Sequence, residues 1–165
     1  MRLMFKIEDY IVRAEKSLVV GLIFAMVAFS FMQVLLRIFF HSGVVWLDPL
    51  LRHMVLWAGL IGAALAARYS QHFALEAFVK LAPVSLHRPL EIFVGLFTAA
   101  ASGLLFYASY KFIRDEFGAG SIAFYIDRLG VPGGWAEIII PAAFALIAYH
   151  ALMGLFRPKE EKTWA

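Results

Sequence analysis

The chain has no cysteine among its 165 residues, which excludes disulfide bonds, thiolate metal ligands and thiol chemistry. Charged residues are also scarce: aspartate, glutamate, lysine and arginine make up 16% of the chain, against about 25% in soluble domains. The lysines and arginines bracket apolar runs instead of gathering on one surface, so a nucleic acid is excluded as a partner.

Apolar residues are correspondingly abundant. They make up 62% of the chain, against about 45–50% in soluble domains, and the mean hydropathy is +0.78. Residues 17–36 carry no charge, and these 20 residues are long enough to cross the hydrocarbon of a bilayer. We therefore predict an all-α integral membrane protein, a single domain over 1–165 with four transmembrane helices at approximately 17–40, 48–69, 89–113 and 133–156.

Shorter amphipathic segments flank these helices. Residues 1–16 predict an interfacial helix that leads into the membrane, with Leu3, Ile7, Ile11 and Ala14 near one face. Residues 69–90 predict a second surface helix, which Pro83 ends. The apolar segment 121–126 is expected to dip into the membrane interface.

The distribution of positive charge predicts the orientation. Ten of the 15 lysines and arginines lie on the side of the two termini, and positive charge favours the cytoplasmic side. Both termini are therefore expected in the cytoplasm, with the chain crossing the membrane several times.

The second apolar helix carries two ladders of small residues at a spacing of four, which puts each ladder on one side of a helix. The ladders are Ala58/Gly62/Ala66 and Gly59/Ala63/Ala67. Small residues let helices approach closely in lipid, so this helix is expected to be surrounded by other helices. Gly95, Ala99 and Gly103 suggest a similar contact on the third helix.

Polar residues are expected near the helix ends. Asp48 and Arg52 are four apart with the acid first, the favourable order for a pair on one helix, and Pro49 suits a helix start. Arg37 is expected to snorkel to the headgroups. Pro141 lies one turn into the fourth helix, where it leaves the Glu137 carbonyl without a partner and can bend the helix.

The sequence contains no motif for catalysis. It has no HExxH, Walker loop or serine elbow, so we expect neither an enzyme nor a bound metal or cofactor. One alternative is a membrane anchor of a redox complex, with or without haem, in which His72 and His150 at the cytoplasmic side could ligate iron. Another is a small multidrug-type exporter, which needs an acid at mid-membrane; the nearest candidates, Glu91 and Glu137, lie at helix starts.

Two motifs resemble the small membrane subunit (DctQ-type) of tripartite ATP-independent periplasmic, or TRAP, transporters. The first is Trp46-x-Asp48-x-x-x-Arg52-x-x-x-x-Trp57-x-x-x-x-Gly62-Ala63-Ala64, followed by Arg68-x-x-x-His72-Phe-x-Leu-Glu76. The second is Leu129-Gly-Val-Pro132-x-x-Trp135-x-Glu137-x-x-x-Pro141-x-x-Phe144. The family more often has Glu at the position of Asp48.

The resemblance implies a scaffold in the bacterial inner membrane for a large (DctM-type) membrane subunit, which carries out sodium-driven uptake of an organic acid delivered by a periplasmic (DctP-type) binding protein. Candidate contacts with that subunit or with membrane lipids are Trp46, Asp48, Arg52, Trp57, Gly62, Ala63, Arg68, His72, Trp135, Glu137 and Pro141. Asp115 and Glu116 are the candidates for docking the binding protein.

Overall fold

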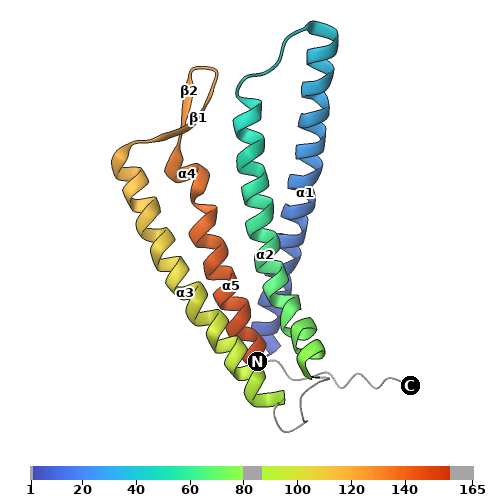
Figure 1. The fold of residues 1–165 in the computed structure, drawn as a ribbon, viewed down its shortest axis with the longest axis vertical. Coiled ribbons are helices and arrows are strands. Elements are labelled where there is room, and N and C mark those ends of the chain that lie inside the picture. The colour runs from blue at the N-terminus through green and yellow to red at the C-terminus, as the bar shows by residue number, and fades with distance from the viewer. Residues whose placement is uncertain (1, 80–86, 157–165) are drawn as a thin grey trace, which may run out of the picture.

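The computed structural model describes residues 2–79 and 87–156, which form five helices and one β-hairpin (Figure 1). In chain order the elements are α1 (Arg2–Phe40), α2 (Leu47–Val79), α3 (His87–Ala119), β1 (Ile122–Ile126), β2 (Leu129–Pro132), α4 (Gly133–Glu137) and α5 (Ile139–Phe156).

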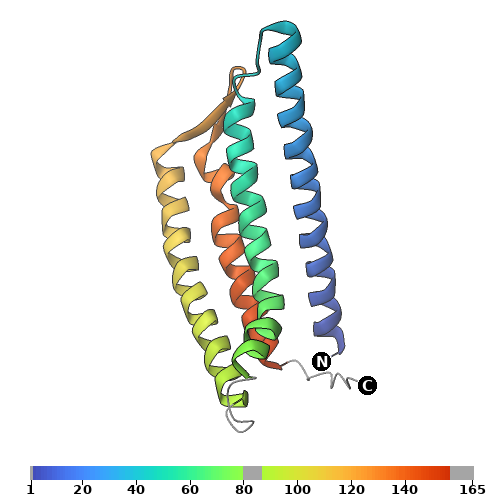
Figure 2. The ribbon, with the colours of Figure 1, turned by 45° about the vertical axis from the view of Figure 1, so that its right-hand side comes forward.

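The long helices form an open row rather than a closed bundle. Helix α5 packs between α3 and α2, and α1 packs against the other side of α2 (Figures 1 and 2). The start of α1 and the end of α5 lie at one end of the row, here called the terminal end. The β-hairpin and the α1–α2 connection lie at the opposite end, here called the hairpin end.

Four stretches of the described residues are long and apolar enough to cross a membrane: Glu8–Phe40, Leu47–Tyr69, Arg88–Ala119 and Gly133–Leu155. This confirms the prediction of four apolar helices. They differ in how much of their surface the chain itself covers. The most apolar window of the first is only 6% buried, against 28% for the last, because α1 stands at the edge of the row and α5 near its middle.

Helix α1 runs without a break from Arg2 through the predicted start of the membrane span. At about 1.5 Å per residue its 39 residues reach about 58 Å, well beyond a hydrocarbon core of about 30 Å. We expected a separate interfacial helix over residues 1–16, with Ala14 on its apolar face. The structure instead exposes Ala14 and buries Glu8, Val12 and Glu15, because the acidic side of this segment faces the neighbouring helices.

Helix α2 buries a different face from the one that its small residues predicted. Its most covered side chains are Leu47, Met54, Ile61 and Ala64. By contrast, Gly59, Ala63 and Ala66 are exposed, and a Cβ added at Gly59 or Gly62 would meet no atom within 4 Å. Large apolar residues therefore pack within the chain, and much of the small-residue surface points away from it.

Helices α3 and α5 approach closely at Gly95. A Cβ at this position would lie 2.6 Å from Cδ2 of Leu155, so a larger residue there would require the Leu155 side chain to shift. The predicted contact does not continue to Gly103, which is exposed and has no neighbour within 4 Å of a Cβ. A spacing of four drifts around a helix that turns every 3.6 residues, so buried Ser102 takes that place instead.

The segment expected to dip into the membrane interface is the first strand of the hairpin. Strands β1 and β2 are antiparallel, with Ile126 opposite Leu129 and Phe124 opposite Val131. The turn between them is tight, and Asp127 has a positive φ of 53°, which aspartate tolerates better than most residues. After the hairpin, α4 ends at Glu137 and α5 begins at Ile139, the region where Pro141 cannot donate a backbone hydrogen bond.

Candidate functional site

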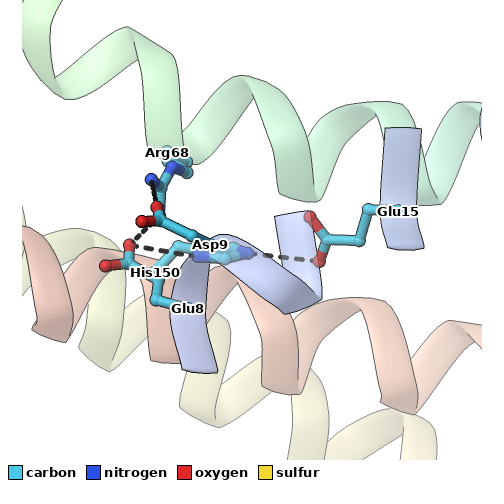
Figure 3. A network of polar contacts seen from close by, with 5 residues as sticks. All are labelled: Glu8, Asp9, Glu15, Arg68 and His150. Carbon is cyan, nitrogen blue, oxygen red and sulfur yellow. Dashed lines mark hydrogen bonds and ion pairs between the residues drawn. The ribbon is translucent and has the colours of Figure 1, made fainter. Parts of the chain in front are cut away.

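The most distinctive polar group lies at the terminal end, where three helices meet. Helix α1 contributes three acids, α2 an arginine and α5 a histidine (Figure 3). We call these side chains the buried cluster: Glu8, Asp9, Glu15, Arg68 and His150. Glu8, Glu15 and His150 are each less than 5% exposed, and 9% of the Arg68 side chain is exposed; Asp9 lies at the rim.

Helical spacing explains why α1 can supply this cluster. Positions 8, 12 and 15 are four and three residues apart, so Glu8, Val12 and Glu15 line one side of the helix. The same spacing of three and four residues continues along α1 on its buried and half-buried side: Val19, Leu22, Met26, Phe29, Gln33 and Leu36. This contact face is apolar in its middle and polar toward both ends.

Arg68 connects α2 to α1 through two carboxylates. Its Nη1 forms an ion pair with Glu8, and its Nη2 donates to Oδ1 of Asp9 at 2.9 Å. Two acids on adjacent positions of α1 therefore share one planar guanidinium, a geometry that a lysine cannot reproduce.

His150 connects α5 to α1 through both edges of its ring. Nε2 lies 3.1 Å from Oε1 of Glu15, within hydrogen-bond distance, and Nδ1 lies 3.8 Å from Oε1 of Glu8 (Figure 3). Both ring nitrogens thus face carboxylates, so neither is presented to a haem iron. The side chain of His72, the other histidine of the haem alternative, lies outside the described residues.

A different set of contacts holds α1 at the hairpin end; we call it the loop contacts. Nε2 of Gln33 donates to the Val44 carbonyl at 3.1 Å, and the Val44 N–H donates back to Oε1 of Gln33 at 3.2 Å. Arg37 pairs with Asp48 at 3.2 Å, with both side chains half exposed or more. Asp48 therefore pairs with Arg37 across the α1–α2 connection instead of with Arg52. Arg37, which we expected to extend to the headgroups, holds α1 to the start of α2.

Helix α2 is connected to α4 at the hairpin end through Trp57. Its Nε1 donates to the carbonyl of Ala136 at 2.7 Å, which joins α2 to α4. Trp57 is thus a contact within the chain. Trp135 is 63% exposed and lies edge-on to Phe117, and one oxygen of half-buried Glu137 is covered without a hydrogen-bond partner in the described residues.

The acids proposed for docking differ from each other. Asp115 is exposed, whereas Glu116 accepts a hydrogen bond from Ser121 Oγ and so fixes the start of the hairpin. Gly133 sits against both of these partners, since a Cβ there would lie 2.7 Å from Ser121 Oγ and 2.8 Å from Glu116 Oε2. Asp115 therefore remains available to a partner, and Glu116 shapes the surface.

The remaining predicted site residues are dispersed. Trp46 is half-buried and Arg52 exposed near the start of α2, and Ala63 is exposed beside half-buried Gly62 in its middle. Pro141 is buried in α5. The structure brings Arg68 into the buried cluster and leaves the others along the helices.

Sequence reasoning missed Glu8, Glu15 and His150. The acids were assigned to an exposed interfacial helix, and the histidine was considered only as a haem ligand. A signal was present, because Glu8 and Glu15 are seven apart and share a helical face with Val12. Among the side chains that the structure describes, no three from His, Asp or Glu are placed to hold a metal ion.

Four apolar helices joined by polar contacts near their ends define a multi-pass membrane protein. The chain belongs to the family described as "Tripartite ATP-independent periplasmic transporters, DctQ component", whose model matches residues 26–159. This is a family of transporter subunits rather than enzymes, and the redox-anchor alternative is not favoured.

Two relatives are also subunits or permeases of TRAP transporters. The chain is 30% identical over 102 residues to the C4-dicarboxylate TRAP transporter small permease protein DctQ of Pseudomonas aeruginosa. The aligned segment covers 62% of this chain and 49% of that protein. The chain is 27% identical over 139 residues to the sialic acid TRAP transporter permease protein SiaT of Haemophilus influenzae. This aligned segment covers 84% of this chain and 21% of that protein. The chain thus spans about half of the first relative and about a fifth of the second.

Proposed function

We propose that this chain is the small subunit that scaffolds a large transport subunit in the inner membrane, for sodium-driven uptake of an organic acid delivered by a periplasmic binding protein. The observation that carries the proposal is the family match over residues 26–159. The names of the two relatives support the substrate class, since C4-dicarboxylates and sialic acid are both carboxylated compounds.

The surface of α2 supports a role beside another membrane protein. Gly59, Ala63 and Ala66 are exposed, and this row has the small residues that let helices approach closely in lipid. The match to SiaT supports the same role, since the matched segment is only 21% of that longer permease. Surfaces of this kind suit a helix of the large subunit.

Replacement of a small residue on this surface tests the scaffold role. We expect Gly62→Leu or Ala63→Leu to reduce co-purification with the large membrane subunit of the transporter, and to reduce uptake with it. An added side chain in a close contact costs about 1–3 kcal/mol, roughly a 5- to 150-fold loss in association. The open space around Gly62 predicts that the isolated subunit still folds.

Gly103→Leu on α3 is the matched control, because a Cβ there would likewise meet no atom within 4 Å and this glycine lies outside the small-residue surface of α2. It should leave assembly intact. Normal assembly and uptake in both α2 variants would instead assign the small-residue surface to lipid and contradict the scaffold proposal at this face.

For the orientation, we propose that the terminal end lies in the cytoplasm. The charge distribution along the sequence supports this, because the predicted topology assigns ten of the 15 lysines and arginines to the side of the two termini. Since the chain has no cysteine, single cysteines can be introduced at Thr163 and at Asp127 and labelled from either side. Labelling of Thr163→Cys by an impermeant reagent added outside would reverse the assignment.

For the binding protein, we propose that the hairpin end contributes to its docking surface, with Asp115 as a contributing charge. Exposed charges at a rim change the rate of encounter more than the final affinity. Asp115→Lys should therefore alter uptake at low binding-protein concentration and low salt, while the membrane complex stays intact. Identical concentration curves at two salt concentrations would remove Asp115 from this surface.

A further inference from the structure

The charged residues that bound the four membrane helices do not lie at one level of the row, where level means position along its long direction. Each helix has a stretch without aspartate, glutamate, lysine or arginine: 17–36 on α1, 53–67 on α2, 139–156 on α5 and 92–110 on α3. Contacts between helices show how these stretches line up, because residues in contact lie at nearly the same level. Each position adds about 1.5 Å along a helix.

At the hairpin end, the boundary of the charge-free stretch differs between α1 and α2. Arg37 closes the stretch on α1, and its ion pair with Asp48 puts both residues at the same level. The exposed charge that closes the stretch on α2 is Arg52, four positions further toward the terminal end. The boundary therefore moves by about one turn, or about 6 Å, between these neighbours.

Contacts of α4 extend the comparison to α5 and α3. The carbonyl of Ala136 accepts a hydrogen bond from Trp57, so Glu137, the last acid before the stretch on α5, lies near the level of Trp57. A Cβ at Gly134 would lie 2.8 Å from the ring of Phe117, which puts these two residues at one level. Phe117 is therefore about two positions beyond Trp57, toward the hairpin end.

On α3 the boundary lies furthest toward the terminal end. The exposed charge that closes its stretch is Lys111, six positions before Phe117, and so four positions on the terminal side of Trp57. Arg37, level with Asp48, is nine positions on the hairpin side of Trp57. The boundary thus shifts by thirteen positions, or about 20 Å, between α1 and α3.

The boundary at the terminal end shifts in the same direction. The stretch of α1 begins two positions beyond Glu15, which lies at the level of His150. The stretch of α3 begins three positions before Gly95, which lies at the level of Leu155, five positions past His150. This shift is ten positions, or about 15 Å. Figures 1 and 2 show the same stagger, since α1 extends furthest at the hairpin end and α3 furthest at the terminal end.

We infer that the row crosses the bilayer obliquely: its contact with lipid hydrocarbon is a slanted band that lies nearer the hairpin end on α1 and nearer the terminal end on α3. Packed helices are about 8–10 Å apart, so the three steps from α1 to α3 cover about 27 Å. A shift of about 15–20 Å over this width corresponds to a tilt of about 30°, within the range of membrane helices.

An upright row would not suit both of its edges. If the hydrocarbon were levelled on α1, it would enclose Lys111, Arg114 and Asp115, which are exposed on α3, and charges in hydrocarbon are costly. If it were levelled on α3, the hairpin side of α1, with exposed Phe31 and Val34, would lie in water. The slanted band avoids both costs.

Two pairs of exposed residues test the slant, because the members of each pair lie at one level of the row. Counted from the same contacts, Phe24 of α1 is level with Phe112 of α3 to within about one turn, and Ala14 of α1 is level with Ala100 of α3. The chain has no cysteine, so each position can carry a single spin-labelled cysteine. The measured quantity is the depth of the label in liposomes, from its collisions with oxygen and with a water-soluble nickel chelate.

We expect the labels of Phe24→Cys and Ala100→Cys to lie about 10 Å deeper in the hydrocarbon than those of Phe112→Cys and Ala14→Cys. The deeper member thus belongs to α1 in the first pair and to α3 in the second. His41→Cys, in the exposed α1–α2 connection, is the control that should meet the chelate freely in either arrangement. Equal depth within both pairs is the result for an upright row and would overturn the inference.

A second measurement needs no substitution. Solid-state NMR of nitrogen-labelled protein in aligned bilayers reports the angle between each helix and the bilayer normal. We expect an average of about 30° for α2, α3 and α5. Angles near zero for these helices would overturn the inference, even if a cysteine variant failed to fold.

Discussion

Helix α1 is attached to the rest of the chain by two groups of polar contacts that differ in kind. The buried cluster at the terminal end uses charged groups removed from water, with three of its members less than 5% exposed. The loop contacts at the hairpin end use a glutamine on backbone groups and an ion pair whose side chains are 61% and 50% exposed. A buried charge without a partner is costly, whereas a hydrated one can turn to water. The first attachment is therefore sensitive to each member and the second is tolerant.

Removal of Arg68 should have the largest effect. Arg68→Met leaves Glu8 and Asp9 without their shared guanidinium, and breaking a buried pair in this way costs about 3–5 kcal/mol. We expect unfolding in mixed micelles at a clearly lower denaturant concentration, followed by circular dichroism. Arg68→Lys keeps the charge but not the fork, so it should fall between Arg68→Met and the parent. Equal stability of all three would show that the two attachments do not differ in kind.

Removal of Gln33 should have an intermediate effect. Gln33→Leu breaks two hydrogen bonds to Val44, but the Val44 backbone lies in a connection that water can reach, so the cost should be about 1 kcal/mol. Amide exchange of Val44 should quicken by about fivefold. The exchange of amides near Val12 should not change. A loss comparable to that of Arg68→Met would mean that water does not replace these bonds.

Removal of Arg37 should have the smallest effect. Exposed ion pairs contribute about 0–1 kcal/mol and are screened by salt, so Arg37→Gln should lower the unfolding midpoint slightly at 50 mM salt and not at 500 mM. The same salt series should hardly change the effect of Arg68→Met, because its partner Glu8 is buried. If Arg37→Gln lowered the unfolding midpoint equally at both salt concentrations, the two attachments of α1 would not differ as described.

Much of the fold was predictable because it depends on apolar length. A run of about 20 uncharged residues identifies a membrane-spanning helix whatever its neighbours are, and residues 17–36 form such a run. The hairpin was not predicted. Its first strand, Ile122–Ile126, is a short apolar stretch, and such a stretch is compatible with a strand or with an interfacial segment until its partner is known.

The polar contacts were harder to predict, since they depend on which helices are neighbours. Asp48 has a suitable partner at Arg52 within its own helix, but the structure places Arg37 of α1 beside it. The contact that His150 makes with Glu15 could not be foreseen from its own helix, because Glu15 is 135 positions away in the chain. A sequence read along one helix at a time favours partners within that helix.

Helix α1 stands at the edge of the row, and this has one more consequence, which concerns the lipid that surrounds the subunit. On its exposed side Lys16 and Arg37 bracket the uncharged residues 17–36, and these 20 residues correspond to about 30 Å along the helix. That length is close to the thickness of a typical hydrocarbon layer. A thicker or thinner bilayer would force α1 to change its tilt or deform the lipid, at a fraction of a kcal/mol for each ångström of mismatch. We therefore expect the subunit to fit best in a bilayer whose hydrocarbon layer has about this thickness.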